Sequence, residues 1–312
     1  KPPAILLFSL LFLLSCNGGD NDQGNNDKDP DPVFYTPSEF VMGADLSYVN
    51  QILDHGGVYR DSAATEDPYK IFSQYGCNVV RLRLFHNPLW TKELYGATGI
   101  RMYNDFEDVK TAILKSKNEG MQVCLDFHYS DSWADPGKQV PPAAWQDLTL
   151  EELHDSLYNY TFKILDKLNA SGLMPEYVQV GNEINPGFVL PQGKRWDGNE
   201  GNMIYLLKSA IRAVRDAGSG STVKPKIIIH IAQPENADPW FNGLASGGLT
   251  DYDIIGLSYY YMWSSTGIAN LDNVISGLKS KYGKEVMIME TAYPWTTSNA
   301  DNYNNIIAVN KI

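Results

Sequence analysis

Two glutamates stand at the ends of short apolar runs that are rich in strand-forming residues. Glu183 follows the run at 177–180, and Glu290 follows the run at 286–289. If both runs are parallel strands of one barrel, the two carboxylates lie at its carboxyl-end face, where such barrels carry out their chemistry. A pair of this kind can cleave a glycosidic bond, because one carboxyl protonates the leaving oxygen and the other attacks or stabilises the sugar cation.

Polar residues near these glutamates predict how the pair is controlled. Arg81 and Arg83 alternate with apolar residues, so they share one face of a strand. Charges inside a barrel need carboxylate partners, and we expect Glu290 to be one of them; an ion pair that only ties strands together is compatible with this. Tyr260, after another strand-like run, could donate to Glu290 and keep it ionised. Asn182, beside the other glutamate, could bond the sugar 2-hydroxyl.

The segment 128–137 follows a third strand-like run and reads His-Tyr-Ser-Asp-Ser-Trp-Ala-Asp-Pro-Gly. It combines hydrogen-bonding groups with an aromatic face, and both are useful for holding a sugar. A single histidine is more often structural than catalytic, but His128 follows a strand end on the same rim as the two glutamates. We therefore expect His128, Asp131 and Trp133 to belong to the site. Trp133 and Trp295 are the candidates for faces on which sugar rings stack.

The elements that must position these residues alternate along the chain. Strands are expected at 40–46, 78–84, 122–127, 177–180, 226–230, 253–258 and 285–289, and amphipathic helices at 68–75, 105–118, 150–169, 203–217 and 271–282. This alternation is typical of parallel α/β folds. Glycines after the helices predict left-handed C-caps at Gly76, Gly120, Gly172, Gly218 and Gly283.

Seven β/α units are visible, whereas a closed (β/α)₈ barrel needs eight. Residues 291–312 read as a polar loop and contain no strand pattern. Either the eighth unit is missing from this chain or the sheet does not close. We favour a (β/α)₈ TIM barrel over 38–312 whose eighth unit is missing, because an open sheet would leave two unpaired edges. No internal repeat or second domain is evident.

The N-terminal segment is expected to direct export rather than to fold. Residues 4–14 form an apolar run too short to span a bilayer, and it ends in Leu-Ser-Cys at 14–16. This resembles a bacterial lipobox, which predicts cleavage before Cys16 and lipidation of its thiol; an ordinary signal peptide is the alternative. Residues 17–37 are polar and acidic, which predicts a flexible tether or a surface-export signal. We expect a bacterial outer membrane lipoprotein exposed at the cell surface.

Composition narrows the class of partner. The 312 residues are 43% hydrophobic and 20% charged, with a net charge of −12. Such acidity disfavours nucleic acid and fits a neutral substrate. Cys77 and Cys124 are expected to be buried thiols, because neither has the spacing of a disulfide framework or of a metal site. We expect a monomer.

Six segments together resemble a known enzyme family. They are 43–47, 80–83, 128–137, 180–183, 255–260 and 290–294. They resemble clan A glycoside hydrolases and, within that clan, the endo-β-1,4-galactanases of glycoside hydrolase family 53, over roughly 40–305 of the chain. The Asn-Glu pair is a signal at the level of the clan, whereas the 128–137 segment is far more specific.

The resemblance implies a (β/α)₈ barrel that cleaves β-1,4-galactan, the side chain of type I arabinogalactan and of pectin, by a retaining double displacement. Glu183 would be the acid/base and Glu290 the nucleophile. The residues expected to bind substrate are Asp45, Arg81, Arg83, His128, Asp131, Trp133, Asn182, Tyr260 and Trp295.

Three alternatives remain beside this resemblance: a bound calcium ion, a different glycan substrate, and glycan binding without cleavage. Some bacterial members bind calcium through alternate residues, which here are Asn299, Asp301, Tyr303 and Asn305. Only one of these is a carboxylate, so we expect no required cofactor and keep a structural calcium as the alternative. Cleavage of mannan or xylan would use the same machinery, but the 128–137 segment argues against it. A non-catalytic glycan-capture protein would lack one of the carboxylates.

Overall fold

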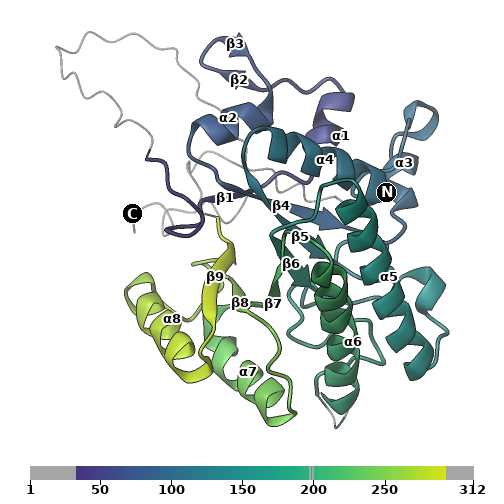
Figure 1. The fold of residues 1–312 in the computed structure, drawn as a ribbon, viewed down its shortest axis with the longest axis vertical. Helices are drawn as coiled ribbons and strands as arrows, with labels where there is room; N and C mark the ends of the chain where they lie inside the picture. The colour runs from purple at the N-terminus through teal and green to yellow at the C-terminus, as the bar shows by residue number, and fades with distance from the viewer. Residues whose placement is uncertain (1–32, 197, 199, 293–312) are drawn as a thin grey trace.

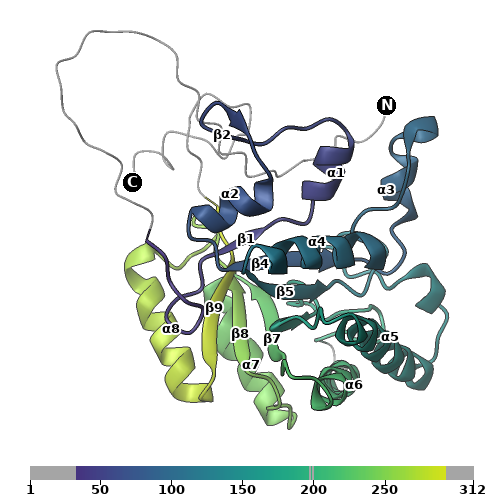
Figure 2. The same cartoon turned by 45° about the horizontal axis from the view of Figure 1, so that its top comes forward.

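One parallel sheet of seven strands forms the centre of the molecule in a computed structural model that describes residues 33–292, apart from 197 and 199. The strands are β1 (Gly43–Asp45), β4 (Val79–Leu84), β5 (Gln122–Phe127), β6 (Tyr177–Val180), β7 (Lys226–Ala232), β8 (Ile254–Ser258) and β9 (Glu285–Glu290). Their order in space follows their order in the chain. Figures 1 and 2 show that the sheet curls, with the long helices on its outer side.

Helices connect successive strands, as a parallel sheet requires. They are α2 (Pro68–Gln74), α4 (Phe106–Asn118), α5 (Leu150–Ala170), α6 (Glu200–Ser219), α7 (Ala237–Ser246) and α8 (Ile268–Tyr282). Smaller elements are α1 (Val49–Asp54), α3 (Leu89–Glu93), the hairpin β2 (Arg60–Asp61) and β3 (Ala64–Thr65), and three 3₁₀ turns, η1 (Gly96–Thr98), η2 (Ala143–Trp145) and η3 (Pro234–Asn236). The winding is that of a (β/α)₈ barrel, and residues 33–292 contain seven of its strands.

The seven expected strands are confirmed, but the helices differ from expectation in two places. Helix α7 was not expected, because Pro239 and Gly243 interrupt its sequence pattern. Gly76, Gly120, Gly172 and Gly283 adopt the left-handed conformation predicted after helices, whereas Gly218 does not. The prediction for Gly218 was wrong because α6 continues past it to Ser219.

Local signals explain where the longest helix begins. The Thr149 hydroxyl accepts a hydrogen bond from the backbone N–H of Glu152, and the Glu152 carboxylate accepts one from the backbone N–H of Thr149. This reciprocal pairing satisfies two N–H groups that the helix itself leaves free. Helix α5 therefore starts at Leu150, as the capping box predicts.

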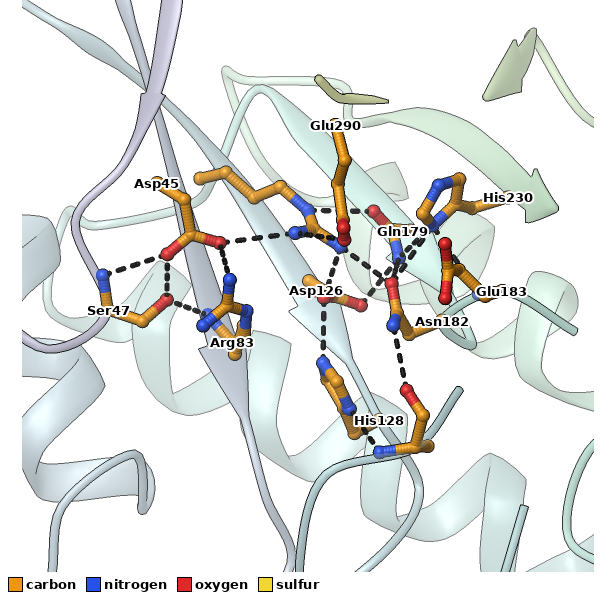
Figure 3. A network of polar contacts seen from close by, with 12 residues as sticks. Asp45, Ser47, Arg83, Asp126, His128, Gln179, Asn182, Glu183, His230 and Glu290 are labelled. Atoms are coloured by element: carbon orange, nitrogen blue, oxygen red, sulfur yellow. Dashed lines mark hydrogen bonds and ion pairs between the residues drawn. The ribbon is translucent and has the colours of Figure 1, made fainter. Parts of the chain in front are cut away.

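The inner face of the curled sheet is built in two layers. The lower layer is apolar and consists of Val79, Cys124, Tyr177, Ile228 and Ile254. Because strand side chains alternate between faces, the next inward residues lie one layer higher, toward the carboxyl ends of the strands. That upper layer is polar and contains Asp126, Gln179, His230 and Glu290 (Figure 3), together with Arg81, which contacts Asp126 and Glu290. The outer face of the sheet packs against the helices through a larger apolar core.

Three other expectations concern the chain outside the barrel interior. The tether was placed at 17–37, yet the Tyr35 carbonyl already accepts a hydrogen bond from Asn78, next to β4. Cys77 and Cys124 are buried free thiols, as expected. Within the described part of the chain, no helix is long and apolar enough to cross a membrane.

Candidate active site

Arg81 is the centre of the polar layer, and its partners come from the barrel interior. Its guanidinium contacts the Asp45 carboxylate at 3.1 Å, that of Asp126 at 2.7 Å and that of Glu290 at 2.8 Å. It also donates to the side-chain oxygens of Gln179 at 3.1 Å and Asn182 at 2.7 Å. Figure 3 shows these partners around one guanidinium. A buried cation with this many acceptors fixes the relative positions of five strands or strand ends.

Glu290 lies where the expected ion pair would place it. Its Oε1 contacts Arg81, and its Oε2 accepts a hydrogen bond from the Tyr260 hydroxyl at 2.9 Å. Burial alone would raise the pKa of this carboxyl, but the opposing effects, of which the positive charge of Arg81 is the largest, together outweigh burial and lower the pKa to about 2. Glu290 is therefore an ionised carboxylate at neutral pH, as a nucleophile must be.

The pKa of Glu183 is shifted in the opposite direction from that of Glu290. Burial raises its pKa, the negative charge of Glu290 raises it further, and the resulting pKa is about 7. This carboxyl can therefore hold a proton near neutral pH. Its backbone has a φ of 46°, in the left-handed region, and Gly181 two residues earlier has a φ of 81°. The turn directs the Glu183 side chain to the carboxyl-end face of the sheet (Figure 3).

His128 reaches this rim but is buried there, with 2% of its surface exposed. Its Nε2 lies 3.0 Å from the Asp126 carboxylate, and its Nδ1 accepts a hydrogen bond from the backbone N–H of Ala134 at 3.0 Å. Asp126 in turn binds Arg81. The contacts of His128 thus reach Glu290 through Asp126 and Arg81, which differs from the substrate contact expected from sequence.

Arg83 has a carboxylate partner that the sequence did not identify. It pairs with Asp45 at 2.8 Å, whereas Glu290 is paired with Arg81 alone of the two arginines. The Arg83 guanidinium lies 4.2 Å from the centre of the Trp133 ring and 5.4 Å from that of Tyr48. The Arg83 guanidinium over the Trp133 ring restrains the indole, so Trp133 is held as a fixed face.

Asn182 is fully buried, and both ends of its amide already have partners. Its Nδ2 donates to the Ala134 carbonyl at 2.8 Å, while its Oδ1 accepts from Arg81. The structure therefore places Asn182 inside the packed network. The contact to the sugar 2-hydroxyl stays a prediction.

Asp131 binds backbone groups of neighbouring loops on the rim and does not belong to the polar layer. Its carboxylate accepts hydrogen bonds from the backbone N–H groups of Asn87 and Ala143, at 2.9 and 2.8 Å. The remaining site predictions, Trp295, the lipidation site Cys16 and the calcium positions Asn299, Asp301 and Asn305, lie outside the described residues. Among residues 33–292, no group of three or more histidine, cysteine or acidic side chains is arranged to hold a metal ion.

Four polar residues of the site were not predicted. Asp126, Gln179, His230 and Ser258 are each fully buried and each follows an apolar residue within a strand. The available signal was a single polar residue at an inward position of an otherwise apolar strand. Such a residue is costly to bury alone, so several on neighbouring strands indicate a shared network.

Replacing Arg81 by Met should lower the free energy of unfolding by about 3–5 kcal/mol, because it leaves the buried Asp126 and Glu290 carboxylates without their cation. Urea unfolding curves would measure the loss. The matched control is Arg215→Met, since Arg215 also binds two carboxylates but is 35% exposed. That variant should lose about 1 kcal/mol or less. Equal losses in both variants would contradict the structural role given to Arg81.

Comparisons with known sequences agree with the site. Residues 41–311 match the model of a family described as Glycosyl hydrolase family 53. An arabinogalactan endo-beta-1,4-galactanase of Cellvibrio japonicus (strain Ueda107) is 44% identical over 272 residues, covering 86% of this chain and 69% of that protein. An endo-beta-1,4-galactanase of Bacillus subtilis (strain 168) is 35% identical over 274 residues, covering 86% of this chain and 60% of that protein.

Solved structures give the same result. A structure described as an Ignisphaera aggregans GH53 catalytic domain superimposes with a TM-score of 0.75 at 35% identity, covering 89% of this chain and 75% of that one. A structure from a study of two fungal beta-1,4-galactanases has a TM-score of 0.75 at 30% identity, covering 83% of this chain and 76% of that one. The family match contains every residue of the polar layer described above.

Proposed function

Because the chain belongs to glycosyl hydrolase family 53, we propose that it is a retaining endo-hydrolase of β-1,4-linked galactan, acting on type I arabinogalactan and pectin side chains and releasing galacto-oligosaccharides. The observation that carries the reaction type is the pair of glutamates with opposite pKa shifts. Two carboxyl groups whose environments separate their pKa values in this way divide the acid and nucleophile roles between them. The substrate class is taken from the named activity of the relatives.

In the first step, a carboxylate oxygen of Glu290 attacks the anomeric carbon of the sugar. The bond from that carbon to the glycosidic oxygen breaks, and Glu183 gives its proton to the departing oxygen. Arg81 and the Tyr260 hydroxyl hold the Glu290 carboxylate ionised and oriented before attack. The products of this step are a shortened chain and a glycosyl ester of Glu290.

In the second step, Glu183 is ionised and acts as a base. It takes a proton from a water molecule, whose oxygen attacks the anomeric carbon and displaces the Glu290 carboxylate. Both glutamates return to their starting protonation states. Glu183 must therefore serve as an acid and then as a base, which a pKa of about 7 allows near neutral pH.

Recognition of galactan is proposed to depend on aromatic faces at the rim. Galactose carries an axial 4-hydroxyl, so chains linked through it bend, and an apolar patch of CH groups is left on one side of the ring. Trp133, restrained by Arg83, offers a fixed face for such a patch. Burial of CH groups contributes about 25 cal/mol per Å², which is enough to favour a correctly curved chain over several rings.

Digestion of galactan, mannan and xylan in parallel tests this proposal. We expect a fast fall in galactan chain length and the appearance of short galacto-oligosaccharides, with and without EDTA, because we propose that the reaction requires no cofactor. Product size over time would be followed by chromatography. Faster cleavage of mannan or xylan, or galactose as the sole early product, would contradict the proposal. Binding to galactan without any cleavage would favour the glycan-capture alternative.

We further propose that the protein is a monomeric outer membrane lipoprotein anchored through Cys16 and exposed at the cell surface. The support is the apolar run at 4–14 that ends in Leu-Ser-Cys and is followed by a polar segment. Replacing Cys16 by Ala should move the protein from the membrane fraction to the soluble fraction, because stable anchoring depends on the acyl chains. Fractionation of expressing cells measures this, with Cys77→Ala as the control. An unchanged membrane fraction for Cys16→Ala would refute the anchor.

A further inference from the structure

His230 has no role in the reaction as described so far, yet it lies between the strands that carry the two glutamates. It is fully buried on β7, and Figure 3 shows its imidazole beside Asn182 and Glu183. Burial lowers its pKa to about 4, so the ring is neutral near neutral pH. A neutral imidazole carries one proton, and the nitrogen that bears it decides what the neighbouring groups can do.

The contacts of Nδ1 indicate that this nitrogen is unprotonated. The backbone N–H of Glu183 donates to Nδ1 at 3.4 Å. A buried backbone N–H requires an acceptor. The Gln179 side-chain nitrogen also lies 3.1 Å from Nδ1. Oδ1 of Asn182 also lies 3.0 Å from Nδ1, but its two lone pairs already accept hydrogen bonds, from Arg81 at 2.7 Å and from Gln179 at 3.1 Å.

With Nδ1 as an acceptor, the proton is on Nε2. That nitrogen lies 2.9 Å from the hydroxyl oxygen of Ser258, at the end of β8, which is fully buried. The imidazole then donates to the hydroxyl oxygen, so the hydroxyl proton of Ser258 is left to point elsewhere. The carboxylate of Glu183 is a hydrogen-bond partner of the Ser258 side chain, and this bond lowers the pKa of Glu183 against the effect of burial.

We propose that His230 and Ser258 are positioning residues for the acid/base Glu183. The imidazole accepts from the Glu183 backbone, donates through Nε2 to Ser258, and thereby turns the serine hydroxyl to donate to the Glu183 carboxylate. This inference rests on the proposed function, since it takes Glu183 as the acid/base. The His230 ring thus holds the left-handed backbone of Glu183 directly, and it holds the Glu183 side chain through Ser258.

The proposed hydrogen bond from Ser258 to Glu183 favours the stage of the reaction in which Glu183 is ionised. A donor to a carboxylate stabilises its ionised form, which Glu183 adopts once it has protonated the leaving oxygen. The charged or titratable groups that face Glu183 are Glu290 from β9, Arg81 from β4, Asp135 from the loop after β5 and Tyr260 from the segment after β8, besides His230 itself. Arg81 favours the ionised form of Glu183, whereas Glu290 and Asp135 oppose it. The Ser258 hydroxyl, by contrast, is a neutral donor to Glu183, so it can be removed without changing any charge.

Ser258→Ala should therefore shift the alkaline limb of kcat/KM on galactan upward by about half a pH unit to one unit, because the ionised form of Glu183 loses a donor. The matched control is Ser209→Ala, since the Ser209 hydroxyl is also buried and donates to the His154 carbonyl at 2.7 Å, between helices α5 and α6. The limb of that variant should not move. A Ser258→Ala enzyme with lower activity and an unshifted limb would overturn the proposal.

A second measurement does not depend on catalysis. The nitrogen chemical shifts of the His230 ring in the unmodified protein should show a neutral Nε2–H tautomer from about pH 5 to about pH 9. An Nδ1–H tautomer, or protonation of the ring above about pH 6, would overturn the proposal. If the protein cleaved no polysaccharide, the proposed function would fail, while the ring tautomer would still decide the direction of these hydrogen bonds.

Discussion

Replacing Glu290 by Ala should lower kcat/KM on galactan by on the order of 10⁴-fold or more, the size of loss seen when a covalent nucleophile is removed. The physical reason is that no other carboxylate of the described chain contacts both Arg81 and the Tyr260 hydroxyl. Steady-state rates would be measured from the release of reducing ends. An activated aryl galactoside should form no glycosyl-enzyme, which intact-protein mass spectrometry would detect in the unmodified enzyme.

Azide provides the sharper outcome for this variant. A small anion that enters the space left by the side chain should attack the sugar directly and yield an α-linked azide, because only one displacement then occurs. The matched control is Glu285→Ala, which removes another glutamate of β9, whose side chain is exposed and binds Lys226. That variant should keep nearly full activity. Retention of a glycosyl-enzyme by Glu290→Ala would show that the nucleophile is another residue.

Replacing Glu183 by Ala should have a different pattern. On galactan, whose leaving group needs a proton, the rate should fall by about 10²- to 10⁴-fold. On an aryl galactoside with an acidic phenol, the first step needs little help, so the glycosyl-enzyme should form and accumulate. Azide should then restore turnover and give the β-linked azide. The alkaline limb that reports the pKa of Glu183, about 7, should disappear from the kcat/KM profile of this activated substrate.

The two variants together decide the assignment of roles. Accumulation of glycosyl-enzyme in Glu183→Ala, combined with its absence in Glu290→Ala, is the expected result. Accumulation in Glu290→Ala and none in Glu183→Ala would reverse the two roles. Glu183→Gln adds a control for packing, because it keeps the shape of the side chain and loses only the ability to exchange a proton.

The parts of the site that sequence predicts are those whose chemistry is visible within one strand. Glu183 and Glu290 end apolar runs, and the alternation of Arg81 with Leu82 places the arginine on one face. The Arg81–Glu290 ion pair and the Tyr260–Glu290 hydrogen bond are confirmed by the contacts. Each of these needs only strand periodicity and the shared rim of a parallel sheet.

The part that sequence does not predict depends on register between strands. Asp126 is paired with Gln179 across β5 and β6, and Ser258 with Glu290 across β8 and β9, where an irregularity shifts the pairing by one residue. A single polar residue in an apolar strand does not indicate which residue of the adjacent strand will lie opposite it. The partner of Arg83 was not predicted for the same reason, because Asp45 is brought beside it by the pairing of β1 with β4.

The backbone at Glu183 has a consequence for how far this protein can be made heat-resistant. A residue with a side chain in the left-handed region costs about 1 kcal/mol, and a glycine there would avoid that cost. The raised pKa adds a second cost. The folded chain holds the Glu183 proton more tightly than the unfolded chain does. The fold is therefore less stable at neutral pH than in acid, and the free energy of unfolding falls as pH rises from about 4 to the folded pKa near 7.

Both costs fall on one residue, and both are removed by the same change, Glu183→Gly, which removes the proposed acid/base. Selection for thermal endurance alone would therefore drive this position away from glutamate, and only selection for turnover holds it there. Stabilising substitutions for this enzyme belong on the helices outside the sheet, such as the exposed face of α8. Variants recovered from a screen that scores survival on heating alone should be sequenced at position 183 first.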